Sequence, residues 1–396
     1  MKRTSLTLGV LGLVHAAIGC DVGDHSAVSG GAGGATASGT TSSGAISSGA
    51  TAGGTTSSGA GSGGSSPVSG LPIPPGAGND PAPSGAAGGL KVISWAGLTA
   101  AVTYTFDDSQ PSQIEHWTDL KAEGIRGTFY VNEVNDWAAD YVTTWQEAAQ
   151  SGWEIGNHTV HHCYEDGNCS SNGATFTTPS AEFDTNTTYI QTTLGQADVW
   201  TGAYPFGDTG YEPFAKTRFF VARGIPSSAT PQIIMPNDST DPYNLPCVAA
   251  VAAGGQPASD FIANIDMAHT SGGWLILLFH SITPTETANL WYAPTAITSI
   301  TGSIDHAKSL PDVWIDTLSN VAAYWVGQKL LTTATPASSG GDTTWTWTLP
   351  NHFPTGKFVR VTVTGGTLKQ GSQALTWNPH GFYEVSLDAG ALTLTP

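Results

Sequence analysis

The sequence predicts an α/β protein with a small second domain rich in β-strands. Between about residues 90 and 330, short apolar runs alternate with amphipathic helical segments, as in a parallel β/α barrel or a doubly wound sheet. From about residue 336 the hydrophobic pattern has a period of two, which is typical of antiparallel strands. We therefore expect a leader, a linker, an α/β domain and a β domain, over residues 1–20, 21–90, 91–333 and 334–396.

Each element of the α/β region follows from its local pattern. Apolar, β-branched and aromatic runs predict strands at 100–106, 127–131, 153–158 and 274–280, and helical periodicity predicts helices at 111–124, 140–152 and 260–273. Near the end of this region, another helix is indicated by the helical spacing of Trp314, Leu318, Val321 and Trp325. In a barrel, catalytic groups gather where strands end, and the polar clusters described below lie at such ends.

The C-terminal region predicts a small antiparallel domain. Its strand-like runs are separated by Gly and Pro turns and lie at 343–349, 357–366, 374–377 and 382–396. Trp345, Trp347 and Trp377 are either the core of this small sheet or a platform on which sugars stack.

The N-terminus resembles an export signal. Lys2 and Arg3 precede an apolar run, Leu6–Ile18, which is too short to span a membrane as a mature helix. The run ends in "AIGC", which resembles the lipobox of bacterial lipoproteins, so Cys20 is the expected site of lipidation. The alternative is an ordinary signal peptide with an incidental cysteine. Either way we expect an exported protein, lipid-anchored to the bacterial membrane and cell envelope or secreted.

The expected linker is low in complexity and poor in charge. No Lys or Arg occurs between Arg3 and Lys91, and Gly, Ser, Ala and Thr dominate the segment. Such a chain of about 65 residues would span roughly 45 Å. The net charge of −18 therefore lies almost wholly after Lys91, which argues against nucleic acid as a partner. We expect a monomer.

Three cysteines remain after Cys20. Cys163 and Cys169 flank the turn-like "YEDGN", and export implies an oxidising compartment, so we expect them to form a disulfide. Cys247 is then left over, or is an alternative partner for one of them. No CxxC spacing indicates a thiolate metal site.

A metal site is predicted by two clusters at strand ends. Asp107 and Asp108 end the strand "AAVTYTF", and "EIGNHTVHHC" contains His158 and His162, which a helical turn would place on one face. Two imidazoles and one carboxylate form a three-ligand site of the kind that holds a catalytic divalent metal. One aspartate is then a ligand and the other a base, and His161 points elsewhere.

Two further clusters complete the predicted chemistry. A tight turn at "GAYPFGD" would direct the amide of Phe206 into the site as an oxyanion donor. "WLILLFH" places His280 at the end of a strand, on the face that carries Ile276 and Leu278, where an imidazole is suited to protonate a leaving group.

Taken together, these segments resemble the polysaccharide deacetylase family (the NodB-homology domain, carbohydrate esterase family 4) over roughly residues 95–330. The family motif T-F-D-D matches residues 105–108, and H-[ST]-x-x-H matches 158–162. The motif R-x-P-[FY]-G matches 203–207, although Ala203 replaces the arginine, and L-x-H matches 278–280. The aspartate of the fourth motif is not placed, and Asp238 and Asp241 are candidates only.

The resemblance implies a distorted (β/α) barrel and specific roles. Asp107 is the base, Asp108 joins His158 and His162 around a metal that is usually zinc, with cobalt or another divalent ion as alternatives, and His280 is the acid. The implied substrate-binding residues are Tyr204, Pro205, Leu278 and Trp137.

The implied activity is removal of acetyl groups from a polysaccharide. N-Acetylglucosamine-containing peptidoglycan, chitin oligomers or exopolysaccharide are the expected substrates. Acetylated xylan is the main alternative substrate, and a catalytically inactive glycan-binding protein at the cell surface is the alternative class.

Overall fold

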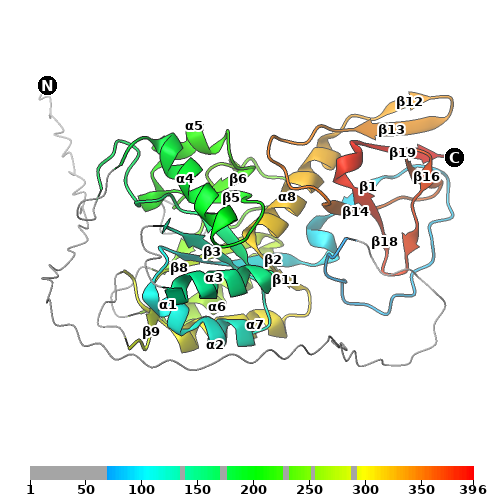
Figure 1. Ribbon diagram of the computed structural model, residues 1–396. Coiled ribbons are helices and arrows are strands. Elements are labelled where there is room, and N and C mark those ends of the chain that lie inside the picture. Colours follow the sequence, from blue (N-terminus) through cyan, green and yellow to red (C-terminus); the bar gives the residue numbers. More distant parts are fainter. Residues whose placement is uncertain (1–68, 134–138, 170–175, 226–231, 251–254, 287–291) are drawn as a thin grey trace, which may run out of the picture. The chain divides into compact units, whose positions relative to one another are not determined.

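The computed structural model describes residues 69–133, 139–169, 176–225, 232–250, 255–286 and 292–396 (Figure 1). The chain divides into two units, 1–65 and 66–396, and only the second lies among these residues. The predicted signal, Cys20 and most of the linker are therefore outside the described part, as is Trp137. Within the described residues, no helix combines the length and apolar character needed to cross a membrane.

A parallel sheet forms the centre of the α/β region. Its strand order is β6-β5-β4-β3-β2-β8-β7, and β11 also pairs with β2. The strands are β2 (Ala100–Asp107), β3 (Thr128–Val131), β4 (Glu154–Asn157), β5 (Thr201–Ala203), β6 (Val221–Arg223), β7 (Val248–Ala249), β8 (Trp274–Phe279) and β11 (Val313–Ile315). Every pairing in this sheet is parallel, and the result is a curled, distorted barrel.

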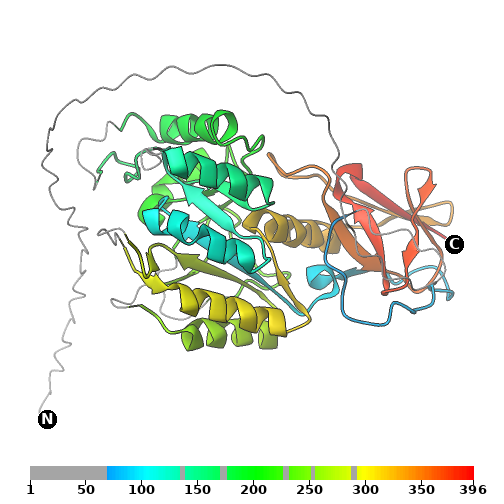
Figure 2. The ribbon, with the colours of Figure 1, turned by 60° about the horizontal axis from the view of Figure 1, so that its bottom comes forward.

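Helices cover this sheet (Figure 2). They are α1 (Pro111–Glu115), α2 (Trp117–Ala122), α3 (Ala139–Gln150), α4 (Pro179–Thr192), α5 (Glu212–Ala215), α6 (Ala258–Ser271), α7 (Ile297–Ser309) and α8 (Leu318–Thr333). A short parallel ribbon joins β9 (Ile282–Thr283) to β10 (Thr295–Ala296). The expected helix at 111–124 is thus two helices, which meet at His116.

Strand β2 shows how the sequence positions the site. All eight residues are buried, as in a parallel strand covered on both faces. Val102, Tyr104 and Phe106 pack in an apolar cluster with the helices. Because side chains alternate along a strand, Asp107 lies on the opposite face, with Thr103 and Thr105. The strand therefore delivers a carboxylate to the interior of the barrel.

The expectation that Trp314 belongs to the last helix was wrong. Trp314 lies on β11, and α8 begins only at Leu318. The hydroxyl of Thr317 accepts a hydrogen bond from the backbone N–H of Asn320, and this cap fixes the helix start.

The C-terminal residues form two antiparallel sheets, of order β1-β14-β18-β17 and β12-β13-β19-β15-β16. Their strands are β1 (Lys91–Ile93), β12 (Ala337–Ser339), β13 (Asp342–Thr346), β14 (Phe358–Thr362), β15 (Thr367–Gln370), β16 (Gln373–Ala374), β17 (Trp377–Asn378), β18 (Phe382–Ser386) and β19 (Ala391–Thr395). One apolar cluster runs from α8 into both sheets, so the two regions share a core.

The linker predicted to end at residue 90 ends earlier. Residues 69–90 are described and pack against the C-terminal sheets: Arg360 donates to the carbonyl of Pro72, and the N–H of Gly85 donates to the carbonyl of Thr364. Residues 91–93, which we assigned to the α/β domain, form strand β1, and this strand pairs with β14. These backbone contacts compensate for the low apolar content of the segment.

Candidate active site

The two adjacent aspartates diverge at the end of β2. Asp107 is the last residue of the strand and is 2% exposed. Asp108 has φ = 74° and Ser109 has φ = 49°, so the chain turns through the left-handed region immediately after the strand. This backbone conformation is uncommon for residues other than glycine and is frequent at functional sites. The turn lets Asp108 face a different set of partners from Asp107.

His158 and His162 follow β4 in an irregular loop and not in the helical turn that their spacing suggested. Thr159 and His162 have φ values of 66° and 52°. The side-chain oxygen of Asn157 accepts from the N–H of Thr159, and the hydroxyl of Thr159 accepts from the N–H of His162. These bonds hold a tight turn that still brings the two imidazoles together, with ring centroids 4.8 Å apart.

Asp108, His158 and His162 form a candidate metal site. Asp108 Oδ1 lies 3.2 Å from Nε2 of His158 and 3.2 Å from Nε2 of His162. One ligand atom from each of the three residues lies within 4.8 Å of the others. His158 Nδ1 donates to the carbonyl of Ala203 at 2.9 Å, which leaves Nε2 as the nitrogen that can bind a cation. This donor set fits a divalent metal such as zinc.

The charges of this cluster are strongly coupled. Burial alone would raise the pKa of the Asp108 carboxyl, but His162, His158 and His280 outweigh burial and hold the pKa far below its usual range. Burial lowers the pKa of His162 to about 4, partly offset by Asp108. Near neutral pH Asp108 is therefore ionised and His162 neutral, which are the protonation states that metal ligands require.

His161 lies outside this cluster. Its Nδ1 is 2.8 Å from Oε1 of Glu182, and Oε2 of the same carboxylate accepts the backbone N–H groups of Val160 and His161. Glu182 is almost fully buried on α4. His161 therefore anchors the histidine loop to that helix.

Asp107 has a different partner, Arg223, which the sequence analysis missed. Arg223 is the last residue of β6 and is 1% exposed, and its Nη2 donates to Oδ2 of Asp107. The guanidinium also lies 5.1 Å from the centre of the Tyr130 ring and donates to the carbonyl of Gly224. Burial opposes its charge, but Asp107, together with Cys247 and Tyr130, outweighs burial and raises the pKa of Arg223 above its usual range. An arginine inside the apolar run "FFVARG" is the sequence signal that could have found it.

The second oxygen of Asp107 is available for chemistry. Among the described residues, buried Oδ1 has no hydrogen-bond partner, whereas Oδ2 contacts Arg223 and lies 3.7 Å from His158 Nε2. A carboxylate with one satisfied and one open oxygen is placed to accept a proton from a nearby water.

His280 lies beside the same cluster, immediately after β8. It is 7% exposed, its Nε2 is 3.9 Å from Oδ2 of Asp108, and its ring contacts that of Tyr292 edge-on. Burial lowers the pKa of this imidazole, partly offset by Asp108. Its Nδ1 is buried without a hydrogen-bond partner among the described residues.

Comparison with known proteins gives one match to a family model. The model of the polysaccharide deacetylase family matches residues 98–217, which include both aspartates and both candidate histidine ligands. A comparison with curated proteins found no match.

This chain is similar to several solved structures, including the following three. The Xyl-CE4 domain of a multidomain xylanase, from the hindgut metagenome of Trinervitermes trinervoides, is 15% identical and aligns over 56% of this chain and 89% of its own, with a TM-score of 0.38. A family 4 acetyl xylan esterase from Clostridium thermocellum, in complex with a cobalt ion, is also 15% identical. It aligns over 56% of this chain and 89% of its own, with a TM-score of 0.36. A peptidoglycan N-acetylglucosamine deacetylase is 16% identical and aligns over 59% of this chain and 90% of its own, with a TM-score of 0.38.

Arg223 lies beside the position at which the expected third motif would carry its arginine. Ala203 on β5 and Arg223 on β6 are direct partners in the parallel register. The position at which the family motif carries arginine is thus occupied by alanine, and the arginine comes from the neighbouring strand. Either location directs a guanidinium toward the interior of the sheet.

Asp238 and Asp241, the two candidates for the fourth motif, bond to backbone groups of their own loop. The Asp238 side chain accepts the N–H groups of Met235 and Thr240, and Asp241 accepts that of Tyr243. Neither carboxylate has a hydrogen bond to His280 in the described part of the chain.

The turn of the third motif brings Phe206 to the metal site. Pro205–Gly207 form a short 3-10 turn in which Phe206 has φ = 57°, and its ring lies 4.4 Å from that of His162. The role of its amide as an oxyanion donor stays a prediction. Tyr204, Pro205 and Leu278 are buried, so their side chains support the site from behind and do not offer a surface to a glycan.

A disulfide joins Cys163 and Cys169 next to the histidine loop, and Cys247 is a buried free thiol whose Sγ lies 3.4 Å from Nη1 of Arg223. The disulfide closes the loop 163–169 beside the candidate ligands. Cys247 instead supports the arginine of the Asp107 pair.

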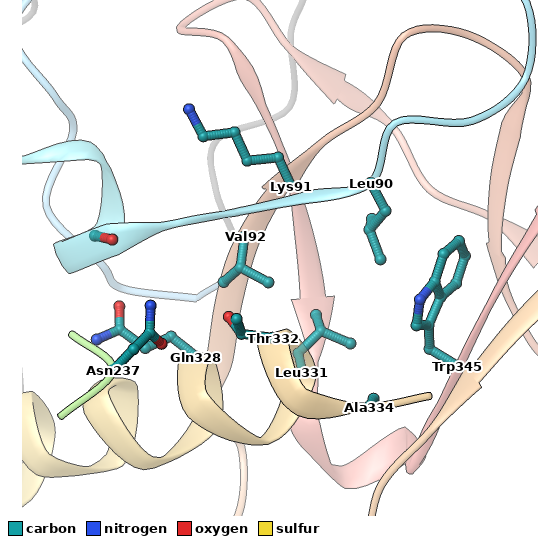
Figure 3. A pocket seen from close by; sticks show the side chains of 10 residues that line it. Leu90, Lys91, Val92, Asn237, Gln328, Leu331, Thr332, Ala334 and Trp345 are labelled. Atoms are coloured by element: carbon teal, nitrogen blue, oxygen red, sulfur yellow. The ribbon is translucent and has the colours of Figure 1, made fainter. Parts of the chain in front are cut away.

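A separate pocket of about 260 Å³ lies between β1, α8 and β13 (Figure 3). Trp345, Leu331 and Gln328 line it, and none of the candidate metal ligands does. The indole N–H groups of Trp347 and Trp377 donate to the carbonyls of Leu387 and Asp80, respectively. Those two rings therefore serve the β region structurally, and only Trp345 contributes to this pocket among the three tryptophans considered from the sequence.

Proposed function

We propose that this protein is a metal-dependent hydrolase that removes acetyl groups from N-acetylglucosamine-containing polysaccharide. One observation carries the proposal: a carboxylate and two imidazoles converge beside a second, buried carboxylate that is paired with arginine. Two aspartates at a strand end repel each other unless each has its own positive partner. Arg223 supplies that partner for Asp107, and a cation would supply it for Asp108.

The metal would be held by Asp108, His158 and His162, and zinc suits this donor set. When bound, such an ion polarises the acetyl carbonyl and increases the acidity of water. Elemental analysis of the purified full chain should find about one divalent ion per molecule. Absence of bound metal after incubation with zinc would contradict the assignment.

Asp107 would act as the general base. Arg223 holds Oδ2, so Oδ1 is oriented to take a proton from the attacking water. The carboxylate is buried, and this excludes competing solvent from the acceptor oxygen.

His280 would act as the general acid. Its imidazole lies next to Asp108 and has a lowered pKa, so once protonated it gives up its proton readily. The acceptor is the departing amine of an N-acetyl sugar, or the alcohol of an acetyl ester. The amide of Phe206, a residue whose ring contacts that of His162, would stabilise the oxyanion that forms before the leaving group departs.

The decisive test is acetate release from a panel of glycans. The zinc-loaded full chain is incubated with chitin oligomers, peptidoglycan, an acetylated exopolysaccharide and acetylated xylan. Release from the N-acetylated substrates is the expected result. Release from xylan alone would assign the acetyl xylan esterase activity, and release from none would favour a protein that only binds glycan.

We also propose that the protein is exported and lipid-anchored through Cys20. The proposal rests on the charged start, the apolar run and the "AIGC" sequence. In a bacterial host, labelled fatty acid should enter the wild type and not Cys20→Ser. An unlabelled wild type would contradict the lipid anchor without affecting the catalytic proposal.

A further inference from the structure

An exposed apolar patch lies beside the candidate metal ligands. Few large apolar side chains are exposed in the described residues, and two of them, Tyr164 (38%) and Ile225 (39%), flank the Pro205–Gly207 turn. The Tyr164 ring is parallel to that of Phe206, with centroids 4.1 Å apart and an interplanar angle of 13°. A Cβ added at Gly207 would lie 2.8 Å from Cβ of Ile225, so Ile225 packs closely on this turn. We call Tyr164, Phe206 and Ile225 the Tyr164 platform.

The platform is continuous with the metal site. Phe206 stacks on Tyr164 on one side and lies edge-on to His162 on the other, with the latter centroids 4.4 Å apart. A ligand on the platform would therefore lie next to the group bound at Asp108, His158 and His162. Exposed apolar patches of this kind commonly mark ligand-binding grooves.

The loop that carries Tyr164 is held rigidly. The disulfide between Cys163 and Cys169 closes it, and the Tyr164 N–H donates to the carbonyl of Asn168 at 2.9 Å. The Glu165 N–H donates to Oδ2 of Asp208 at 2.8 Å, and the hydroxyl of Tyr211 donates to the carbonyl of Cys163 at 2.9 Å. These bonds tie the loop to the segment that follows Phe206. A pre-positioned ring loses little conformational entropy when it binds a ligand.

The chemistry of the patch suits a sugar ring. An aromatic ring with an exposed face and a hydroxyl at its edge offers both apolar contact and hydrogen bonding. Glu165 and Asp166 follow Tyr164 directly, and residues 163–169 contain no Lys or Arg. The local charge therefore disfavours an anionic ligand and accepts a neutral or amino sugar.

We propose that the Tyr164 platform is a sugar-binding subsite, which holds the ring adjacent to the acetylated sugar in a polysaccharide chain. The inference rests on the proposed deacetylase function, which it deepens by assigning a second point of contact to the substrate. It implies that the protein binds oligomers better than single acetylated sugars.

The test compares a long and a short substrate on the metal-loaded full chain. Kinetics are measured with a tetramer of N-acetylglucosamine and with para-nitrophenyl acetate, which carries no sugar ring to place on the platform. Variants are Tyr164→Ala, Tyr164→Phe and the control Met267→Ala, which removes an exposed apolar side chain from α6. Thermal unfolding of each variant checks that the fold is retained.

Tyr164→Ala should raise KM for the tetramer by about tenfold, the effect of losing one aromatic contact, with kcat almost unchanged. Tyr164→Phe keeps the ring and should stay within about twofold of the wild type, as should Met267→Ala, because neither loses the stacking surface. An unchanged KM in Tyr164→Ala overturns the subsite. An equal loss of kcat/KM for the tetramer and for para-nitrophenyl acetate also overturns the subsite, because it would show that Tyr164 supports the metal site itself.

Failure of the proposed function gives a different result. If the wild type releases no acetate from the tetramer, calorimetric titration of the same proteins with the tetramer still tests the platform. If the wild type binds the tetramer and Tyr164→Ala does not, the result supports the subsite on a catalytically inactive protein. Absent binding, or equal binding in both, contradicts it.

Discussion

Asp107 and Asp108 are neighbours in the chain but occupy two different environments. Asp107 faces the interior of the barrel, where its charge is balanced by Arg223 from β6. Asp108, one left-handed residue later, faces the histidines of the loop after β4. The same side chain is thus a candidate base in one place and a candidate ligand in the other. On this assignment, the positive partner of each carboxylate, and not its own chemistry, distinguishes the two candidate roles.

Removing the partners of Asp108 should have the largest effect. His158→Ala combined with His162→Ala leaves one of three ligands, so bound metal and acetate release should both fall to background. Elemental analysis and an acetate assay measure the two quantities. His161→Ala is the matched control and should keep its metal, because His161 contacts Glu182 instead. Metal retained by the double variant would show that the ion binds elsewhere.

Removing the partner of Asp107 should reduce stability as well as rate. Arg223→Met leaves a buried carboxylate without its cation, and breaking a buried ion pair costs about 3–5 kcal/mol. Chemical denaturation and acetate release measure the effects, and bound metal should be retained. Because Ala203 pairs with Arg223 in the sheet register, adding Ala203→Arg should restore part of the rate. Wild-type stability and rate in Arg223→Met would contradict the role of this pair.

A smaller effect is expected from pH in the metal-free protein. The pKa of His162 falls from 6.5 to about 4 on folding, chiefly through burial. Between these values the unfolded chain binds more protons at this site than the folded one, so His162 lowers stability as pH falls from 6.5 to about 4. The melting temperature of metal-stripped wild type should drop more steeply over this range than that of His162→Asn. Equal slopes would show that His162 does not titrate as the burial implies.

Local sequence was sufficient to select the candidate residues that end or follow β2 and β4. Asp107, Asp108, His158 and His162 were found because each pair lies at a strand end and has a recognisable spacing. The expected helical turn between the histidines was wrong, since positive φ values at Thr159 and His162 are set by hydrogen bonds that spacing does not reveal.

Long-range partners were not visible in the sequence. Arg223 reaches Asp107 only through the pairing of β5 with β6, which depends on the register of two short strands. Residues 69–90 resemble a linker in composition, but hydrogen bonds hold them to residues near 360, almost three hundred positions further along the chain. One example is the bond from the N–H of Gly85 to the carbonyl of Thr364. Composition reports how much apolar surface a segment can bury and says nothing of backbone partners elsewhere.

The most direct test of the contrast between the two aspartates is to replace each by asparagine and measure bound metal and acetate release side by side. Asp107→Asn keeps the shape and removes the proton acceptor, so metal should stay while the rate falls by roughly 10²–10⁴-fold. Asp108→Asn weakens a ligand, so metal and rate should fall together and excess zinc should restore part of the rate. Metal loss in Asp107→Asn with full retention in Asp108→Asn would contradict the assignment and reverse the two roles.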